Sequence, residues 1–406
     1  MPETIAIAGG GAAGFFAAIT CARANPANRI TIYERGSEFL TKVRISGGGR
    51  CNVTHDCFDP RAVSERYPRG KRALISPLHR FSPRDTVNWF EERGVKLKTE
   101  ADGRIFPVTD SSQTIIDCLV EEAKAAGVRL LTRNGVEAAR RTTRGFELRP
   151  ARGEATPCDR LLLATGGTRS SSGAAIAESL GHTLLSPVPS LFSFHVNAAW
   201  LRRLPGVSVP AVEASVPRTS LRERGPILVT HQGLSGPVIL RLSAWGARIL
   251  HALDYTFPLR VNWLPDLSEQ QIRNELSRLR DSNPNRRVVN SALASLPARL
   301  WEELTLQAGI NRETRWTTLS RPNTNRLVAL LRGTLFEVNG KSLNKEEFVT
   351  CGGIDLREID FKTMESRVVP HLYFAGEVLD IDGITGGFNF QSAWTTGWIA
   401  GNAMAL

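Results

Sequence analysis

The sequence predicts an α/β fold in which a domain built on a parallel sheet is interrupted by an insertion. Two observations frame the domain. The N-terminal segment has the pattern strand, Gly-rich turn, helix, strand, and the C-terminal segment returns to strand, Gly-rich turn, helix. A third observation marks the insertion, since residues 191–335 differ from both segments in texture and in charge. A chain of 406 residues is long enough for two or three domains of ordinary size.

The N-terminal pattern is predicted to form a parallel βαβ unit. Thr4–Ala8 is an apolar strand, Gly9–Gly14 is the turn, Phe15–Ala24 is a helix of small residues, and Arg29–Tyr33 is a second buried strand. In the remaining flanking segments we expect strands at Val128–Thr132, Gly145–Arg149, Arg160–Ala164, Gly352–Asp355 and His371–Ala375, and helices at Asp85–Arg93 and Ser112–Ala126. Within the insertion, short alternating runs over 191–262 predict antiparallel β structure, and 266–333 is predicted to be helical.

The first turn has the spacing Gly9-x-Gly11-x-x-Gly14, and Glu34 follows twenty residues after Gly14. Such a turn lets the backbone approach a pyrophosphate at a helix N-terminus, where free N–H groups and the helix dipole favour negative charge. A carboxylate placed like that of Glu34 accepts hydrogen bonds from ribose hydroxyls and disfavours a 2′-phosphate. The segment therefore predicts a site for FAD or NAD rather than for NADP.

Two later segments favour FAD over NAD. Ala164–Gly167 ends a buried strand and provides a second turn at which the backbone can approach a dinucleotide. Leu372–Asp380 runs a strand into Gly376 and Glu377, Gly383–Gln391 is Gly-rich, and a helix is expected at Ser392–Ala405. This return of the chain resembles the second cofactor contact of two-part FAD domains, which an enzyme that binds only a nicotinamide does not need.

The charge of the chain is concentrated in two segments. The 51 basic residues exceed the 40 acidic residues by 11, and only 8 of the basic residues are Lys. Arg favours bidentate recognition of carboxylate or phosphate, although a genome rich in G and C gives the same bias. Residues 191–335 hold 19 Arg and 10 acidic residues, and Arg61–Arg84 is a second basic cluster. This distribution favours an anionic partner.

The cysteine pattern bears on the cellular compartment. Six Cys residues include no CxxC pair and no zinc spacing: Cys21, Cys51, Cys57, Cys118, Cys158 and Cys351. This pattern predicts reduced thiols in a cytoplasmic protein, and no metal site. The uncharged stretch Thr4–Ala22 is rich in Gly and follows an acidic residue, so it does not read as a signal peptide, and no membrane span is expected.

The segment Lys42–Thr54 contains Gly47, Gly48 and Gly49 between polar residues, and it predicts a loop suited to a phosphate or a flavin edge. Together with Gly9–Gly14 and three further motifs, it resembles the YhiN/BaiN-type bacterial flavoproteins. The further motifs are THQGLSGP (Thr230–Pro237), TCGGID (Thr350–Asp355) and AGEVLDIDGITGGFNFQSAW (Ala375–Trp394). The resemblance spans both flanking segments and the insertion.

The resemblance implies a glutathione-reductase-like Rossmann FAD domain interrupted by a β-barrel-like subdomain and a helical subdomain. The implied boundaries are 1–190 for the first part of the FAD-binding domain, 191–265 for the β-barrel-like subdomain, 266–333 for the helical subdomain, 334–345 for a return strand of the β subdomain, and 346–406 for the second part of the FAD-binding domain. Family members are associated with flavin-dependent reduction of C=C bonds, in uridine of ribosomal RNA or in steroid-like enones.

Carried over position by position, the resemblance implies FAD contacts at Gly9, Gly11, Ala13, Gly14, Glu34, Arg35, Arg44, Gly49, Arg50, Thr165, Gly166, Gly376, Glu377, Gly386, Gly387 and Asn389. The chain departs from the family at two places. His55 stands where the family usually has Asn, and Thr168–His182 lacks the usual aromatic and Pro residues.

Reduction of a C=C bond needs a proton as well as a hydride, and two residues are candidate donors. Cys51 lies in the Gly loop beside Arg50, a setting that exposes a thiol and lowers its pKa; a small packing residue is the alternative interpretation. His231 of the insertion is the second candidate, with a buried hydrogen-bonded histidine as the alternative. A Cys51–Cys57 redox pair is disfavoured because their spacing matches no motif of that kind.

The sequence thus predicts a cytoplasmic FAD-dependent oxidoreductase that passes hydride from NADH or NADPH through the flavin to an activated C=C bond. Because the insertion is basic, a structured RNA is the leading substrate, and the family resemblance implies that the target is a uridine of ribosomal RNA. Two alternatives remain: a reductase of small hydrophobic enones, and a flavin-containing RNA-binding or redox-sensing protein without turnover. The candidate RNA contacts are Arg69, Lys71, Arg72, Arg286 and Arg287.

Overall fold

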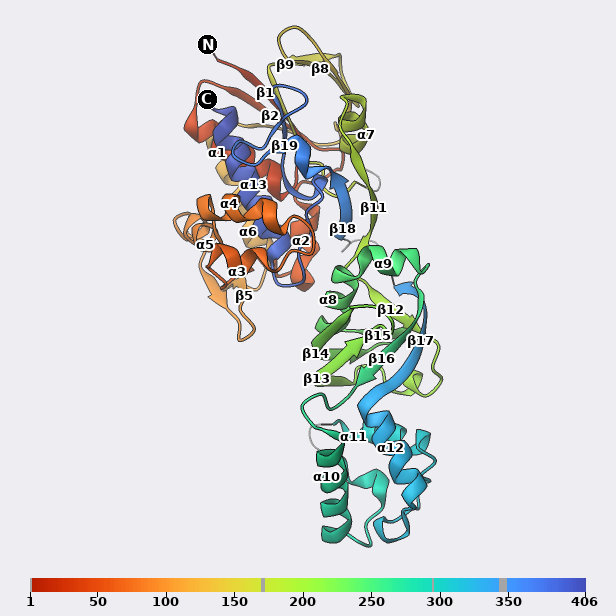
Figure 1. Cartoon of the computed structure of the whole chain (residues 1–406). Coiled ribbons are helices and arrows are strands. Elements are labelled where there is room, and N and C mark those ends of the chain that lie inside the picture. Colours follow the sequence, from red (N-terminus) through yellow and green to blue (C-terminus); the bar gives the residue numbers. More distant parts are fainter. Residues whose placement is uncertain (1, 169–171, 294–295, 343–348) are drawn as a thin grey trace. The chain divides into compact units, whose positions relative to one another are not determined.

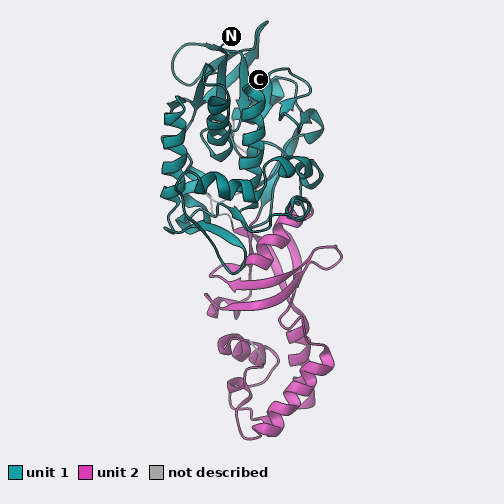
Figure 2. Ribbon diagram, turned by 90° about the vertical axis from the view of Figure 1, so that its left-hand side faces the viewer, with its two compact units in different colours: residues 1–190, 344–406 teal, residues 191–343 magenta. Residues whose placement is uncertain are grey.

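The computed structural model describes residues 2–168, 172–293, 296–342 and 349–406. The chain divides into two compact units, shown in different colours in Figure 2. Unit 1 comprises residues 1–190 and 344–406, and unit 2 comprises residues 191–343. Unit 1 is therefore assembled from two distant stretches of the chain, and unit 2 from one.

Unit 1 is built on a seven-stranded sheet with the order β19-β20-β21-β10-β1-β2-β6. The central strand β1 (Thr4–Ala8) pairs in parallel with β10 (Arg160–Leu163) on one side and with β2 (Arg29–Tyr33) on the other. These strands are largely apolar because both faces of a parallel sheet are covered. The α/β class and the parallel βαβ unit are confirmed. The outer strands are β6 (Arg129–Leu131), β21 (Leu372–Phe374), β20 (Glu365–Ser366) and β19 (Ile359–Asp360).

Two helices from distant parts of the chain pack against each other in unit 1, α1 (Ala12–Ala24) and α13 (Phe388–Met404), as Figure 1 shows. The helix predicted from Ser392 was placed too late, because α13 begins four residues earlier at Phe388. Gly387 is left-handed (φ 88°) and starts the helix, so the residues that read as the end of a Gly-rich loop form its first turn. The other helices of unit 1 are α2 (Thr41–Gly49), α3 (Pro60–Ser64), α4 (Lys71–Arg80), α5 (Pro83–Glu91), α6 (Ser112–Ala125) and α7 (Ser172–Ser179).

Smaller antiparallel sheets complete unit 1. The first pairs β3 (Thr54–His55) with β5 (Arg104–Pro107), which also pairs with β4 (Leu97–Thr99). The strand β3 follows the Gly loop directly, so this sheet fixes where that loop ends. The others contain β7 (Val136–Arg141), β8 (Phe146–Pro150) and β9 (Thr156–Cys158), and β11 (Leu184–Ser190) with β18 (Val349–Ile354).

Unit 2 contains a closed barrel with the strand order β12-β15-β14-β13-β16-β17. Exposed and buried residues alternate along its strands, as in β16, because one face of each strand lines the core. That core continues into the helices: Val261 of β16, Trp301 of α11 and Leu331 of α12 belong to one hydrophobic cluster. The strands are β12 (Ser193–Val196), β13 (Ser208–Ser215), β14 (Arg222–Val229), β15 (Gly233–Ser235), β16 (Thr256–Asn262) and β17 (Thr334–Ser342). The helices are α8 (Pro237–Trp245), α9 (Ala247–Ala252), α10 (Glu269–Ser282), α11 (Ala298–Gln307) and α12 (Arg321–Gly333).

Short 3₁₀ helices occur in both units, at Leu201–Arg203, Val288–Asn290, Trp316–Thr318, Leu356–Glu358 and Gly376–Val378. Within the described residues, no helix combines the length and the apolar composition that crossing a lipid bilayer requires.

Candidate cofactor site

Three glycines of the motif that joins β1 to α1 have different physical roles. Gly9 has φ 116°, and a Cβ there would overlap the carbonyl group of Ala164. A Cβ on Gly14 would overlap the carbonyl oxygen of Gly9, so this glycine lets α1 pack closely on the turn. Gly11 differs, because its backbone is extended (φ −95°, ψ −170°) and a Cβ would meet no atom of the described chain within 4 Å. A pyrophosphate lying against the backbone gives a reason for glycine at this position.

Glu34 fixes this turn from the end of β2. Its Oε2 accepts a hydrogen bond from the N–H of Gly10 (2.9 Å), and its Oε1 accepts one from the N–H of Gly36 (2.6 Å). A carboxylate offers about four lone-pair positions, so both oxygens keep capacity for a ribose hydroxyl. The helix α1 has no side-chain cap at Gly11, which leaves N–H groups of its first turn available to a phosphate.

A cavity of about 70 Å³ lies beside the same turn, at the end of β10. The Oγ1 of Thr165 is buried there with no hydrogen-bond partner among the described residues. The next residue, Gly166, has φ 75° and would direct a Cβ into open space. Because a buried hydroxyl without a partner is costly, this corner fits a polar ligand that completes it. The cavity is lined by Ala8, Gly9, Tyr33, Glu34, Arg35, Gly135, Val136, Thr165 and Ser172.

The N-terminus of α1 is one cradle for a ligand, and the N-terminus of α13 forms a second. No side chain caps the helix at Gly387, so the N–H groups of its first turn are available as they are in α1. The amide of Asn389 closes the preceding loop, since its Oδ1 accepts from the N–H of Gly383 (2.8 Å) and its Nδ2 donates to the carbonyl of Gly383 (2.9 Å). Both polar atoms of the Asn389 side chain, a predicted FAD contact, therefore bind the backbone of this loop. Gly387 packs on β3, where a Cβ would lie 2.7 Å from the carbonyl oxygen of Thr54.

The helices α1 and α13 run in the same direction along a seam of small residues. A Cβ on Gly397 would lie 2.6 Å from the carbonyl oxygen of Ala13, and one on Gly401 would lie 2.5 Å from that of Ala17. Because Gly397 lies level with Ala13, α13 begins eight residues, or about 12 Å, before the level at which α1 begins. Two positive helix ends therefore point the same way at a fixed spacing, which suits an extended dinucleotide with negative charge at two places.

The Gly loop follows a single helical turn in α2. Helical geometry ends at Ser46, and Gly47 and Gly48 are left-handed (φ 58° and 69°). A Cβ on Gly48 or on Gly49 would point into open space, so the loop presents bare backbone, as predicted for a ligand edge. The loop is tied to the second cradle by Asn52, whose amide lies 2.9 Å from both the N–H of Gly387 and the carbonyl of Thr54.

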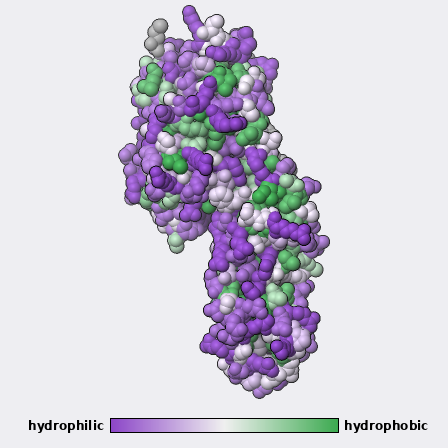
Figure 3. All heavy atoms as spheres, viewed as in Figure 1, coloured by the Kyte–Doolittle hydropathy of each residue, from purple (hydrophilic) through white to green (hydrophobic). Residues whose placement is uncertain are grey.

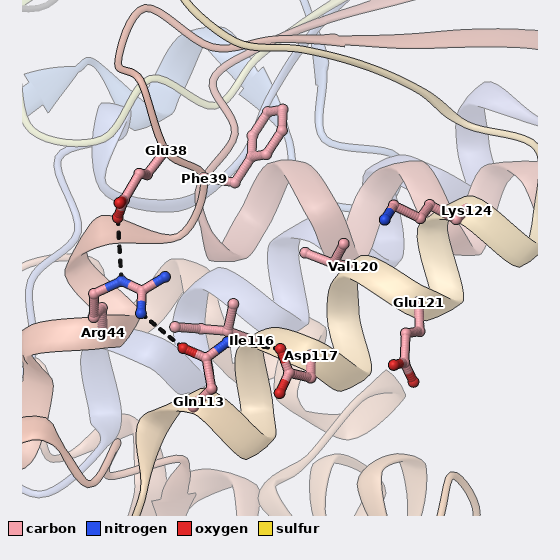
Figure 4. Close-up of a pocket in the computed structure, with 9 residues that line it drawn as sticks. All are labelled: Glu38, Phe39, Arg44, Gln113, Ile116, Asp117, Val120, Glu121 and Lys124. Atoms are coloured by element: carbon pink, nitrogen blue, oxygen red, sulfur yellow. Dashed lines mark hydrogen bonds and ion pairs between the residues drawn. The ribbon is translucent and has the colours of Figure 1, made fainter.

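The two arginines that flank this loop are engaged by protein residues. Arg50 forms an ion pair with Glu100 (2.6 Å), and its guanidinium lies 4.0 Å from the centroid of the Phe106 ring. Figure 4 shows Arg44 bonded to Glu38 (3.3 Å) and Gln113 (2.7 Å) in a groove of about 380 Å³ on α6. None of the residues that line this groove also lines the cavity beside Thr165. Its lining residues are Glu38, Phe39, Arg44, Gln113, Ile116, Asp117, Val120, Glu121 and Lys124.

The environment predicted for Cys51 is wrong. The residue is fully buried and left-handed (φ 61°), and burial raises the pKa of its thiol to about 12, against a smaller lowering by a hydrogen bond with Ser46. The cation of its neighbour Arg50 is directed to Glu100 instead of the thiol. The grounds for nominating Cys51 as proton donor therefore do not hold, and its packing role is the better interpretation. The other candidate, His231, belongs to unit 2, where it is exposed between β14 and β15.

Gly376 and Glu377 lie beside the first turn of α1. Gly376 is left-handed (φ 75°), and a Cβ there would lie 2.9 Å from the Cβ of Ala13. The Oε1 of Glu377 accepts from the N–H of Thr350 (2.9 Å), and its Oε2 forms an ion pair with Lys42. The structure thus brings together the N-terminal turn, the Gly loop and the C-terminal motif, as the predicted contact set requires.

Sequence reasoning did not assign a role to His55. Its ring stacks on Phe388, the first residue of α13, with centroids 4.9 Å apart and planes 22° apart. The signal in the sequence is its position directly after the Gly loop, where it stands out only as a departure from the family.

The candidate RNA contacts have unequal surroundings. Arg69 is engaged within the protein, because it forms a bidentate ion pair with the buried carboxylate of Asp382. Lys71 pairs with Glu65, and Arg72 is exposed. In unit 2, Arg286 is exposed, and Arg287 pairs with Glu313 (2.8 Å) while half of its side chain remains accessible.

The sheet, the two cradles and the bare-backbone loop fit FAD: the end of β2 and the turn before α1 suit its adenosine and pyrophosphate, and the N-terminus of α13 offers a second positive helix end to the rest of the cofactor. The class that this fold and site define is that of the FAD-dependent oxidoreductases. Residues 3–403 match the family described as HI0933-like protein Rossmann domain, and the chain belongs to that family.

Curated relatives of almost the same length match the whole chain. The Ribosomal RNA dihydrouridine synthase of Escherichia coli (strain K12) is 33% identical, over 97% of this chain and 95% of that protein. The 3-dehydro-bile acid delta(4,6)-reductase of Clostridium scindens is 31% identical, over 99% and 98%. Among solved structures, the 3-ketosteroid-delta4-(5alpha)-dehydrogenase of Rhodococcus jostii RHA1 has the same fold, with a TM-score of 0.51 and 14% identity over 100% of this chain and 97% of that one.

Proposed function

We propose that this protein passes hydride from NADH or NADPH through bound FAD to an activated C=C bond. FAD supplies the hydride acceptor and donor. The backbone at Gly11 and the N-terminus of α1 hold its pyrophosphate, and Glu34 holds its adenosine ribose. The N-terminus of α13, positioned by Gly387, would favour negative charge at the other end of the cofactor.

We further propose that the C=C bond belongs to a uridine of ribosomal RNA, so that the product is dihydrouridine and the protein works in the cytoplasm. The observation that carries this proposal is an arginine cluster on the helical part of unit 2. The main chains of Arg287 and Arg315 form a β-bridge, and the carbonyl of Arg286 accepts from the N–H of Trp316 (3.2 Å), which brings the main chains of three arginines close together. Figure 3 shows that hydrophilic residues cover most of the visible face of the helical part of unit 2. The dihydrouridine synthases of E. coli and of Haemophilus influenzae, the latter 28% identical over 97% of this chain, support the same interpretation.

The test follows reoxidation of the flavin. The protein is reduced with NADPH or NADH without oxygen and mixed rapidly with ribosomal RNA made without modifications, and the RNA is then digested and its nucleosides are weighed by mass spectrometry. We expect flavin reoxidation at a rate that depends on RNA concentration, with one dihydrouridine formed per flavin reoxidised. Salt-dependent RNA binding with no reoxidation would instead indicate a flavin-containing RNA-binding protein without turnover.

A second candidate is a reductase of small enones. The relative from C. scindens supports it, because its identity of 31% is close to that of the E. coli synthase. Mixing the reduced protein with a steroid enone, in place of RNA, separates the two proposals. Fast reoxidation by the enone, together with no retention of RNA at low salt, would favour this candidate.

A further inference from the structure

His55 lies against the second cradle and carries a group that can change its charge near neutral pH. Besides stacking on Phe388, its Cδ2 lies 3.3 Å from where a Cβ on Gly386 would be. Its strand neighbour Thr54 packs on Gly387. The imidazole is thus in contact with the loop and with the first residue of the helix whose N–H groups form the cradle. The Nδ1 accepts from the N–H of Cys57 (3.2 Å), which in the neutral ring leaves the proton on Nε2.

The charged groups around this imidazole come from each element packed on it. Asp56 lies beside the ring, with its Oδ1 3.1 Å from Nδ1, and its charge raises the pKa of His55. Asp102, in the turn between β4 and β5, also raises this pKa. Arg66, which follows α3, acts against a proton on the ring. Burial is the largest effect and lowers the pKa of His55 below its ordinary value, so that the ring is neutral at pH 7. Its side chain keeps 20% of its surface exposed, which gives solvent protons access.

We propose that His55 is a positioning residue that takes up a proton from water when the flavin at the α13 cradle is reduced, and releases it when the flavin is reoxidised. The inference rests on the proposed function. Hydride from NAD(P)H brings two electrons and one proton, so the bound flavin gains one negative charge, and imidazolium beside the cradle stabilises that charge. When hydride leaves for the C=C bond, the product carbon takes one proton and His55 gives one up. Over a cycle, NAD(P)H, one proton and the C=C bond become NAD(P)⁺ and the reduced product.

The readout is the midpoint potential of the flavin in the FAD-loaded protein, measured from pH 5 to pH 9. Two protons accompany two electrons wherever His55 is neutral in the oxidised protein and charged in the reduced one, and one proton elsewhere. In the wild-type protein we therefore expect a pH interval in which the slope of midpoint potential against pH is twice the slope at other pH values. The variant His55→Asn is expected to lose that interval. His79→Asn, which removes an exposed imidazole in the last turn of α4, is expected to keep it.

A second variant tests the same idea without touching the ring. Asp56→Asn removes a carboxylate that favours the proton, so the interval of doubled slope is expected to move to lower pH. An unchanged curve in FAD-loaded His55→Asn overturns the inference and leaves the proposed function standing. If His55→Asn does not hold FAD, the Asp56→Asn curve decides, and an unmoved interval overturns it. A wild-type protein that holds no FAD overturns the proposed function, and the inference with it.

Discussion

Arg69 and Asp382 form a buried bidentate ion pair across 313 positions of the chain. The Nε and Nη2 of Arg69 donate to different oxygens of a carboxylate that is fully buried, and Ser190 donates to it as well (2.7 Å). Burial raises the pKa of Asp382 to about 6, while Arg69 and Ser190 act to lower it. Because Asp382 stands in the loop that leads to Gly387, this pair holds one side of the second cradle in place.

The variant Arg69→Ala is expected to lower the free energy of unfolding of unit 1 by about 3–5 kcal/mol at pH 8, because it leaves a buried carboxylate without its partner. The pKa of the Asp382 carboxyl then rises further above that of an aspartate in the unfolded chain. The loss therefore shrinks as the pH falls from this raised pKa toward about 6, and below that the carboxyl is neutral in both proteins. Urea denaturation at pH 8 and pH 5, followed by tryptophan fluorescence, measures both effects.

The double variant Arg69→Leu with Asp382→Leu serves as the control for this prediction. It removes both charges together, so it is expected to recover most of the stability that Arg69→Ala loses. A loss for Arg69→Ala that is equal at pH 5 and pH 8 would contradict the view that the cost comes from the buried charge.

The variant Gly11→Val is expected to fold normally and to lose the flavin. A side chain at this position meets open space in the protein, but it would occupy the place proposed for the pyrophosphate. The protein-bound flavin after gel filtration and the far-ultraviolet circular dichroism spectrum give the two readouts. Gly14→Val is the matched control, expected to destabilise the fold because its side chain overlaps the carbonyl of Gly9. Gly11→Val that retained stoichiometric flavin with an ordinary spectrum would disprove this placement.

Cysteine labelling separates the two thiols near the Gly loop. The nucleophile is the thiolate, so the buried Cys51, with its pKa raised to about 12, is expected to resist iodoacetamide in the native protein at pH 8. Cys57 is partly exposed and is expected to react first. Peptide mass spectrometry identifies the labelled residue, and Cys57→Ser is expected to abolish the first phase while Cys51→Ser leaves it unchanged. Rapid labelling of Cys51 would restore it as a candidate proton donor.

Reversing charge on the arginine cluster of unit 2 is expected to weaken RNA binding. Arg286→Glu with Arg287→Glu adds repulsion to any phosphate held there, and each phosphate that the protein no longer neutralises is expected to reduce the slope of log affinity against log salt by about 1. Filter binding to ribosomal RNA fragments at several salt concentrations gives that slope, and the flavin spectrum is expected to be unchanged. Arg140→Glu with Arg149→Glu makes the same change of charge at exposed positions of unit 1. Equal effects of the two pairs would show that the cluster is not a specific surface.

The parts of the site that could be predicted are those in which one local segment determines both structure and chemistry. The turn from β1 to α1 with Glu34 is such a segment, because glycine spacing and the acidic residue act within a single βαβ unit. The start of α13 was misplaced because its first turn depends on Gly387 packing against Thr54, which lies 333 positions earlier. The burial of Cys51 and the ion-pair partner of Arg69 could not be predicted for the same reason, since both depend on residues distant in the sequence. A basic residue in a sequence reveals its charge but not its partner.

The seam between α1 and α13 also bears on how the chain folds. Its two halves are separated by more than 360 residues, so the packing that spaces the cradles forms only after a long chain closes on itself, a slow and entropically costly step. All residues of unit 2 lie between α1 and α13 in the sequence, and unit 2 has its own continuous core. It can therefore fold first, which shortens the flexible chain that must close for the two helices to meet. A chain that ends before Phe388 would still make the Gly9–Gly14 turn but would have only half of the template for its cofactor, which makes flavin retention a direct report that folding has gone to completion.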